Sequence, residues 1–163
     1  MSILRHAALL ATLLLIPLPA LAVPQVGKAA PGFTLPSPSG RSVSLQALRG
    51  KPVYVNFFAS WCGPCNVEAP WIARLRAKYA KTGLQVVGVD ELEAASSGMA
   101  FVKKHDNPYG LVAVDENGTV GKDYVLLGLP VHVFIDRRGI VTAYRPGEMN
   151  ESEIDAAIKG SLK

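Results

Sequence analysis

The stretch Pro52-Val-Tyr-Val-Asn-Phe-Phe-Ala-Ser-Trp-Cys-Gly-Pro-Cys65 carries the strongest fold signal in the chain. Its first seven residues are almost all apolar and rich in β-branched and aromatic types, which predicts a buried central strand. A helical pattern follows from Trp61 to about Lys81, and Gly83 ends it. A buried strand that leads directly into a helix is the opening unit of an α/β fold.

The remaining chain continues this alternation of strands and helices. We predict strands at 84–90, 111–114, 131–136 and 140–144, and helices at 94–105, 118–124 and 152–162. The last two strands form a hairpin around Arg137-Arg-Gly139, and Ser152 with its acidic neighbours begins the final helix. This order predicts one α/β sheet with helices on both faces.

Length and composition exclude several classes of protein. A chain of 163 residues suits one domain, and 49% apolar against 18% charged residues excludes intrinsic disorder. The net charge of +4 comes without a long basic run or interleaved aromatic residues, so we expect no nucleic-acid partner. Only two cysteines are present, which excludes a disulfide-rich scaffold and marks the pair as a site.

The N-terminal segment has the pattern of a secretory signal peptide. A positively charged start precedes ten uncharged residues at 7–16, two prolines and an Ala-Leu-Ala sequence ending at Ala22. A retained membrane anchor is the alternative, but the apolar run is short against the roughly 20 residues a spanning helix needs. We therefore predict a signal peptide at 1–22, a mature domain at 23–163, and a periplasmic or otherwise exported location, where thiols tend to be oxidised.

Cys62 and Cys65 form a redox pair by their position and spacing. Cys62 falls at the N-terminus of the predicted helix, where unpaired N–H groups and the helix dipole stabilise a thiolate. Pro64 suits the first helical turn because it has no N–H to leave unpaired. The two-residue spacing lets Cys65 reach back to release a mixed disulfide. We therefore expect Cys62 to attack and Cys65 to resolve.

Two other interpretations of the cysteine pair are less favoured. A structural disulfide closing so short a loop would restrict the unfolded chain very little. A zinc site would need His105 and His132, whose separation departs from the usual ligand spacing. Redox chemistry is the interpretation that the pattern supports best, and we predict no metal at this site.

Glu68 is the candidate acid of the site. Residues 68, 72, 75 and 79 form one stripe of the helix, so Glu68 belongs to the face that packs on the sheet. It also lies one turn from Cys65, and a carboxyl group buried beneath a disulfide can hold a proton for that cysteine. The alternative is an exposed acid that the helix dipole favours in the first turn.

Two residues near the end of the chain are further candidates. Pro130 directly precedes the strand predicted at 131–136. A proline at the start of a strand is often only an edge residue. Sequence alone does not show whether the peptide bond before it is cis. His132 lies two residues further, on the same side of the strand as Pro130. It either approaches the sulfur atoms or is a hydrogen-bonded strand histidine.

Several motifs together resemble one family of exported proteins. They are Ala30-Pro-Gly-Phe-Thr-Leu-Pro36, Leu48-Arg-Gly-Lys-Pro-Val53, Asn56-Phe-Phe-Ala-Ser-Trp-Cys-Gly-Pro-Cys65, Gly128-Leu-Pro130 and Phe134-Ile-Asp136. The chain resembles the thioredoxin-like reductases of the TlpA/ResA/CcmG (DsbE) group from about residue 27 to 160. CcmG proteins usually carry Pro-Glu-Thr where this chain has Pro130-Val-His132.

The resemblance implies a thioredoxin-like fold, with a central mixed sheet, a central insertion and a cis peptide before Pro130. It implies that Glu68, in a Cys-x-x-Cys-x-x-Glu pattern, is the active-site acid. Asn56 takes the position of the buried Asp of cytosolic thioredoxins. We expect the redox-active disulfide to join Cys62 and Cys65, and clients to bind around it at Trp61, Gly63, Pro64, Leu129 and Pro130.

The function predicted from these observations is that of an exported thiol:disulfide oxidoreductase, most simply a reductase of client disulfides. Cytochrome c maturation is the setting that the resemblance implies, with apocytochrome c or its maturation factors as clients. A membrane thiol carrier would supply electrons, and no cofactor is expected beyond the cysteine pair. We expect a monomer.

Other functions of the same fold remain open at this point. A thiol oxidase or isomerase would differ only in reduction potential. A copper(I) metallochaperone would hold the ion with Cys62, Cys65 and His132, since soft thiolates suit copper(I). A thiol peroxidase is disfavoured because Ala59 stands where a Thr is expected three residues before the reactive cysteine.

Overall fold

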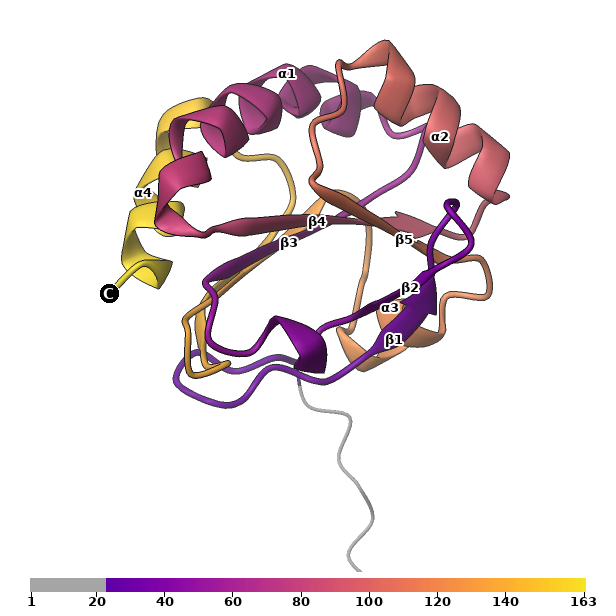
Figure 1. The fold of residues 1–163 in the computed structure, drawn as a ribbon. Helices are drawn as coiled ribbons and strands as arrows, with labels where there is room; N and C mark the ends of the chain where they lie inside the picture. The colour runs from indigo at the N-terminus through magenta and orange to yellow at the C-terminus, as the bar shows by residue number, and fades with distance from the viewer. Residues whose placement is uncertain (1–22) are drawn as a thin grey trace, which may run out of the picture.

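The computed structural model of the chain describes residues 23–163 (Figure 1). The predicted signal peptide, residues 1–22, lies outside the described residues. The strands are β1 Thr34–Pro36, β2 Ser42–Ser44, β3 Val53–Phe58, β4 Gln85–Glu91, β5 Leu111–Asp115, β6 Val131–Ile135 and β7 Val141–Pro146. The helices are α1 Gly63–Lys78, α2 Ala95–Lys104, α3 Thr119–Asp123 and α4 Glu151–Ser161, with 3-10 turns η1 Gln46–Leu48 and η2 Ala80–Thr82.

The central strand β3 organises the main sheet, whose strand order is β5-β4-β3-β6-β7. β3 runs parallel to β4 and antiparallel to β6, and all of its residues are buried. A strand covered on both faces needs apolar side chains on both, which explains the continuous apolar run. Asn56 is the polar exception, and it pairs directly with His132 across the β3–β6 ladder. These two side chains therefore lie on the same face of the sheet.

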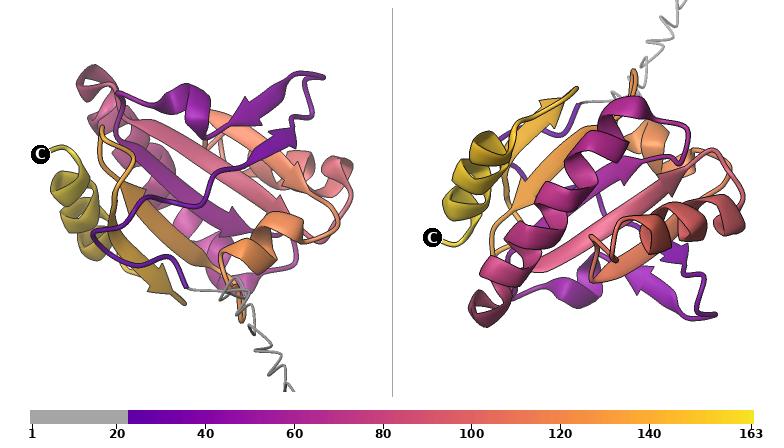
Figure 2. Two further views of the ribbon diagram at one scale, coloured as in Figure 1. Left: turned by 90° about the horizontal axis from the view of Figure 1, so that it is seen from below. Right: turned by 90° about the horizontal axis from the view of Figure 1, so that it is seen from above.

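Helices and strands cover the two faces of this sheet unequally (Figures 1 and 2). One face carries α1, α2 and α4, while the other carries the β1–β2 hairpin, η1 and α3. The first core contains Tyr54, Phe58, Ile72, Leu75, Phe101, Phe134, Ile154 and Ile158. The second core contains Phe33, Leu35, Val43, Val55, Phe57, Val120, Tyr124 and Val133. The α/β fold with a mixed sheet and helices on both faces is confirmed, and the segment between β4 and β6 supplies the implied insertion of α2, β5 and α3.

The structure moves two helix boundaries relative to the sequence-based expectation. α1 ends at Lys78, before the separate 3-10 turn η2 that leads to Gly83, whose φ of 81° requires the left-handed region. The cap of α4 is Asn150 and not Ser152, because Asn150 and Glu153 satisfy each other's backbone N–H groups in a capping box. The hairpin strand β1 was not predicted, since three residues are too few for a periodic pattern.

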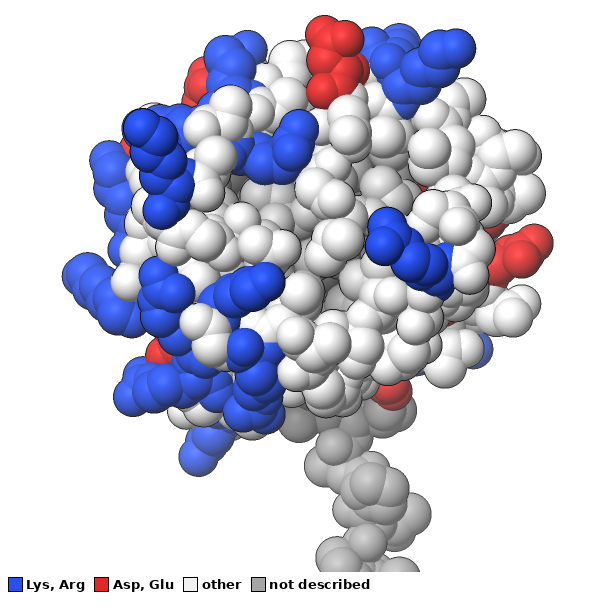
Figure 3. All heavy atoms as spheres, viewed as in Figure 1, with Lys and Arg blue, Asp and Glu red and all other residues white. Residues whose placement is uncertain are grey.

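Basic side chains gather at one end of the molecule, over α4 and the β6–β7 turn (Figure 3). In this region Arg49 donates to the carbonyl of Arg138, and Arg137 donates to the carbonyls of Gly50 and Thr82. These contacts flank the beginning of β3, whereas the cysteine pair follows its end. No helix among residues 23–163 is long and apolar enough to cross a membrane.

Candidate active site

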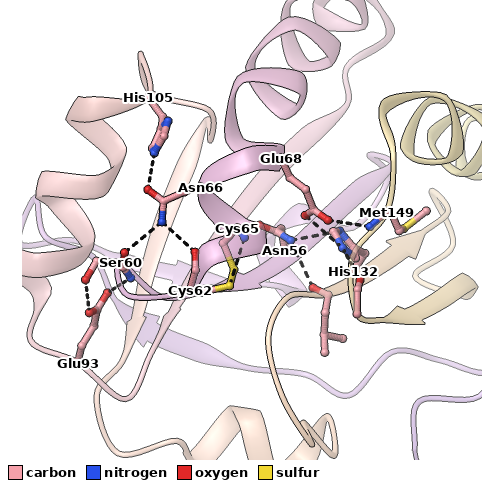
Figure 4. The surroundings of a disulfide bond; sticks show 12 residues. Asn56, Ser60, Cys62, Cys65, Asn66, Glu68, Glu93, His105, His132 and Met149 are labelled. Atoms are coloured by element: carbon pink, nitrogen blue, oxygen red, sulfur yellow. Dashed lines mark hydrogen bonds and ion pairs between the residues drawn. A yellow bond between two sulfur atoms is a disulfide. The ribbon is translucent and has the colours of Figure 1, made fainter.

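The turn from β3 into α1 positions the cysteine pair (Figure 4). Cys62 is the N-cap of α1 and forms a disulfide with Cys65. The Cys65 N–H donates to Cys62 Sγ at 3.2 Å, so the sulfur satisfies one of the free donors at the helix start. Both cysteines are almost fully buried, but the flanking Trp61 is 65% exposed and Gly63 is also exposed. The disulfide therefore lies behind an exposed rim formed by Trp61 and Gly63.

Hydrogen bonds from three elements hold the turn in place. Ser60 donates its backbone N–H and its hydroxyl to the two carboxylate oxygens of Glu93, each at 2.6 Å. The Asn66 amide donates to the carbonyls of Ser60 and Cys62 at 3.2 and 2.8 Å. Its oxygen accepts from Lys104 Nζ at the end of α2 at 3.0 Å, and lies 2.9 Å from Nε2 of His105, which caps that helix. The sequence analysis missed Ser60, Glu93 and Asn66, because their roles depend on contacts between segments distant in the chain.

Glu68 lies in the interior beside the cysteine pair, and not at an exposed first turn of α1. Its side chain is fully buried, and Oε1 accepts the Met149 N–H at 2.7 Å. Its second oxygen, Oε2, has no hydrogen-bond partner among residues 23–163 and lies 3.4 Å from His132 Nε2. Residues three apart in a helix have Cβ atoms roughly 5–6 Å apart, which places Glu68 one turn from Cys65. Its role as an acid stays a prediction.

A buried polar network extends from Glu68 across the sheet. His132 Nδ1 lies 2.8 Å from the Tyr54 hydroxyl and 3.2 Å from Asn56 Nδ2. The Tyr109 hydroxyl donates to Asn56 Oδ1 at 2.7 Å. Burial raises the pKa of Tyr54 and of Tyr109, so both phenols keep their protons. Of the two expectations for His132, the structure places it among hydrogen-bonding groups of the sheet.

The other predicted site residues lie on the rim or behind it. The peptide bond between Leu129 and Pro130 is cis, as the resemblance implied. Pro130 is buried, and Leu129 packs against the core that includes both cysteines. Pro64 is half-buried in the first turn of α1. Binding of a client by these residues stays a prediction.

The structure does not assemble the metal-binding sets considered from sequence. His105 contacts Asn66, and the two ring nitrogens of His132 face polar groups of the protein. In the part of the chain that the structure describes, no three His, Cys, Asp or Glu side chains are grouped to hold a metal ion.

Two pairs of carboxyl groups, all buried except the partly exposed Glu93, lie near the carboxyl ends of β4 and β5, and neither was predicted. Burial and then the neighbouring Glu93 raise the pKa of Asp90 to about 8. Burial and then Asp115 raise the pKa of Glu91 to about 8. Asp90 is fully buried, and neither of its oxygens has a hydrogen-bond partner among residues 23–163. Glu93 accepts from Ser60 and raises the pKa of Asp90, so this pair lies next to the active-site turn.

A Cys-x-x-Cys disulfide at the start of the helix that follows the central strand, on a thioredoxin-like sheet, defines the class of thiol:disulfide oxidoreductases. The Redoxin family matches residues 25–158 of this chain. The chain is 32% identical to the thiol-disulfide oxidoreductase ResA of Bacillus thuringiensis subsp. konkukian over 135 residues, covering 83% of this chain and 78% of that protein. It is 34% identical to the thiol:disulfide interchange protein DsbE of Pseudomonas fluorescens biotype C over 127 residues, covering 77% of this chain and 69% of that protein.

A solved structure agrees with these sequence matches. The Chlorobium tepidum protein assigned as a thiol:disulfide interchange protein DsbE superposes with a TM-score of 0.80 at 33% identity, covering 87% of this chain and all of that one. The chain therefore belongs to the Redoxin family, within the TlpA/ResA/CcmG group of thiol:disulfide oxidoreductases.

The buried acid Asp90 predicts a pH-dependent stability. Its pKa rises from an ordinary 3.8 to about 8, so between these pH values the folded protein holds a proton that the unfolded chain releases. The free energy of unfolding therefore falls as the pH rises through this window. The substitution Asp90→Asn removes this loss of stability. Near pH 8, we expect the variant to have a free energy of unfolding about 2–4 kcal/mol higher than that of the natural protein.

Urea unfolding of the disulfide form across this pH window measures the effect. The exposed acid Glu116 offers a control, and Glu116→Gln should leave the pH dependence unchanged. A stability difference between Asp90→Asn and the natural protein that does not vary with pH would contradict the prediction.

Proposed function

We propose that this thiol:disulfide oxidoreductase reduces disulfides of client proteins in an exported compartment. Cys62 is the nucleophile, Cys65 the resolving cysteine and Glu68 the acid–base group. The observation that carries the proposal is a fully buried carboxyl group on α1, one turn beyond a disulfide that caps the same helix. Such a group can exchange a proton with Cys65 away from solvent.

The proposed reaction transfers two electrons from the cysteine pair to the client. The Cys62 thiolate attacks one sulfur of the client disulfide, and the first client thiolate leaves and takes up a proton. Cys65 then gives its proton to the Glu68 carboxylate, and its thiolate attacks Cys62 Sγ. The second client thiolate leaves, and the Cys62–Cys65 disulfide remains.

The surroundings of the pair favour the reducing direction. Strong oxidants of this fold stabilise their reduced thiolate, which raises the potential. Here Gly63 and Pro64 add neither a donor side chain nor a positive charge between the cysteines. A negative charge on Glu68 would also disfavour a nearby thiolate. Both effects lower the stability of the reduced form and make the pair a better reductant.

Location, clients and electron donor extend the proposal. The pattern of residues 1–22 supports export with cleavage after Ala22, leaving a domain at 23–163. In an oxidising compartment a reductant needs a continuing electron supply, for which we propose a membrane thiol carrier. The sequence resemblance to CcmG favours cytochrome c maturation. Clients would contact the exposed rim at Trp61 and Gly63, and beside it Pro64, Leu129 and Pro130.

The roles of the two cysteines predict which variant traps a client. Cys65→Ser should accumulate a covalent complex through Cys62 when mixed with a disulfide-containing client, because the resolving thiol is missing. Non-reducing electrophoresis and mass spectrometry identify the linked residue. Cys62→Ser is the matched control, and trapping through Cys65 in that variant instead would reverse the assignment.

The acid role predicts a kinetic defect in Glu68→Gln. Loss of the proton acceptor should slow release of the client from the mixed disulfide by about 10²-fold, and remove one titration from the pH profile of Cys65. Stopped-flow measurement of release from pH 5 to 9 tests this (roughly the range in which such groups titrate). Glu148→Gln removes an exposed charge next to Met149 and should behave normally; a normal profile in Glu68→Gln as well would make Glu68 a structural acid.

The proposed direction predicts a reducing potential for the Cys62–Cys65 couple. We expect a value near that of thioredoxin, about −270 mV, and far from the roughly −120 mV of a strong oxidant. Equilibration of the purified protein with glutathione at known ratios, followed by alkylation of free thiols, measures it. A strongly oxidising value would replace the reductase with an oxidase or isomerase.

A further inference from the structure

His132 of β6 lies next to Glu68, the proposed acid. His132 is fully buried and lies beside Glu68 and Asn56 (Figure 4). Each of its ring nitrogens faces two polar atoms. Nε2 lies 3.2 Å from the Gly147 carbonyl oxygen and 3.4 Å from Glu68 Oε2. Nδ1 lies near the Tyr54 hydroxyl and Asn56 Nδ2, at 2.8 and 3.2 Å. The position of the ring proton therefore decides whether His132 can donate to Glu68.

The network around Asn56 determines that position. The Tyr109 hydroxyl donates to Asn56 Oδ1, and burial raises the pKa of Tyr109, so this donor persists. With its oxygen held by Tyr109, the Asn56 amide turns its NH₂ group toward His132 Nδ1. The amide nitrogen only donates, to the Val131 carbonyl at 3.5 Å and toward Nδ1 at 3.2 Å, and the second contact is a hydrogen bond when Nδ1 accepts. A neutral imidazole with an accepting Nδ1 carries its proton on Nε2.

The resulting Nε2–H faces acceptors only. In the disulfide form it is shared between the Gly147 carbonyl and the space beside Glu68 Oε2. At 3.4 Å the two atoms lie close but form no hydrogen bond in the disulfide form, and donation to Oε2 requires the carboxylate to turn toward the N–H. Oε1 already accepts the Met149 N–H, and Oε2 has no other partner among the described residues. Donation to both oxygens stabilises the ionised carboxylate.

We propose that Asn56 and His132 are positioning residues for Glu68. Asn56 holds the proton of a neutral His132 on Nε2, and that N–H stabilises the Glu68 carboxylate that receives the Cys65 proton. This inference rests on the proposed acid role of Glu68 and adds the groups that prepare it. His132 keeps a single ring proton throughout, and the proton of Cys65 passes to Glu68 and then to the leaving client thiolate.

The titratable groups around Glu68 are consistent with this arrangement. Tyr54 of β3 and Tyr109 before β5 face it and stay protonated, because burial raises the pKa of both. Cys65 precedes it on α1, and Asp90 of β4 lies beyond Tyr109. The connection between β7 and α4 contributes the backbone N–H of Met149. Among the ion pairs of residues 23–163, none joins Glu68 to a Lys or Arg. The one that involves Glu68 is with the His132 imidazole.

The protonation of His132 can be observed directly in the unaltered protein. Long-range ¹H–¹⁵N correlation spectra distinguish the Nε2–H tautomer, the Nδ1–H tautomer and the imidazolium ion. We expect the neutral Nε2–H tautomer at neutral pH. In Asn56→Asp, whose carboxylate accepts where the amide donated, Nδ1 should become protonated. An Nδ1–H tautomer or an imidazolium in the unaltered protein would overturn the inference.

Kinetics of client release provide the second test. His132→Leu removes the N–H donor at similar side-chain volume. We expect the acid-side midpoint of the pH profile of client release to rise by about one pH unit. Below that midpoint, release should be about tenfold slower than in the natural protein. His132→Gln retains an N–H donor, so its pH profile of client release should stay close to that of the natural protein. Thr142→Val is the control. It removes a hydrogen bond from Thr142 of β7 to the Phe134 carbonyl of β6 and should leave the pH profile of client release unchanged.

Comparison with Glu68→Gln separates the two levels of the argument. A normal profile in His132→Leu beside an impaired Glu68→Gln refutes the positioning role alone. A normal profile in Glu68→Gln refutes the acid role on which the inference rests. An unchanged midpoint in His132→Gln, together with a shifted one in His132→Leu, supports the N–H donor specifically.

Discussion

The free N–H groups at the start of α1 impose the constraint on which the site depends. Four backbone donors at a helix N-terminus lack partners within the helix, and one of them, the Cys65 N–H, is satisfied by Cys62 Sγ. This places the first sulfur in the positive field of the helix at the carboxyl end of β3. The contacts of Ser60 and Asn66 then hold the turn against the β4–α2 connection and α2. The positions of the two sulfur atoms thus depend on the backbone at the helix start and on the hydrogen bonds that hold this turn.

Carboxyl groups dominate the surroundings of this turn, and one basic side chain, Lys104, reaches it through Asn66. Glu68 lies behind the cysteine pair, and Asp90 with Glu93 lies beside it. The basic residues gather at the opposite end of the sheet, around Arg49 and Arg137. A thiolate at Cys62 therefore has the helix N-terminus as a stabilising partner. This balance agrees with a pair that gives up electrons readily.

The polar network beneath the disulfide is built from two adjacent strands. Asn56 of β3 and His132 of β6 face each other in the antiparallel ladder, and their side chains meet on the α1 face. The helix supplies Glu68 to the same buried space, and the β7–α4 connection supplies the Met149 N–H. Polar groups enclosed in this way interact strongly, because no water competes for their hydrogen bonds.

Local sequence patterns determined the fold class, the cysteine pair and the burial of Glu68. The apolar run at 52–58, the helical stripe through Glu68 and the Cys62–Cys65 spacing are each legible within a few residues, because strand and helix periodicities are local properties. The tertiary structure alone decided the partners: Glu93 for Ser60, Met149 and His132 for Glu68, and Tyr109 for Asn56. It also decided that Asp90 is buried, and the ion pairs of residues 23–163 bring it no Lys or Arg. Each of these contacts joins segments far apart in the chain, and the pairing of such segments depends on how the sheet and its covering helices pack, which no local pattern encodes.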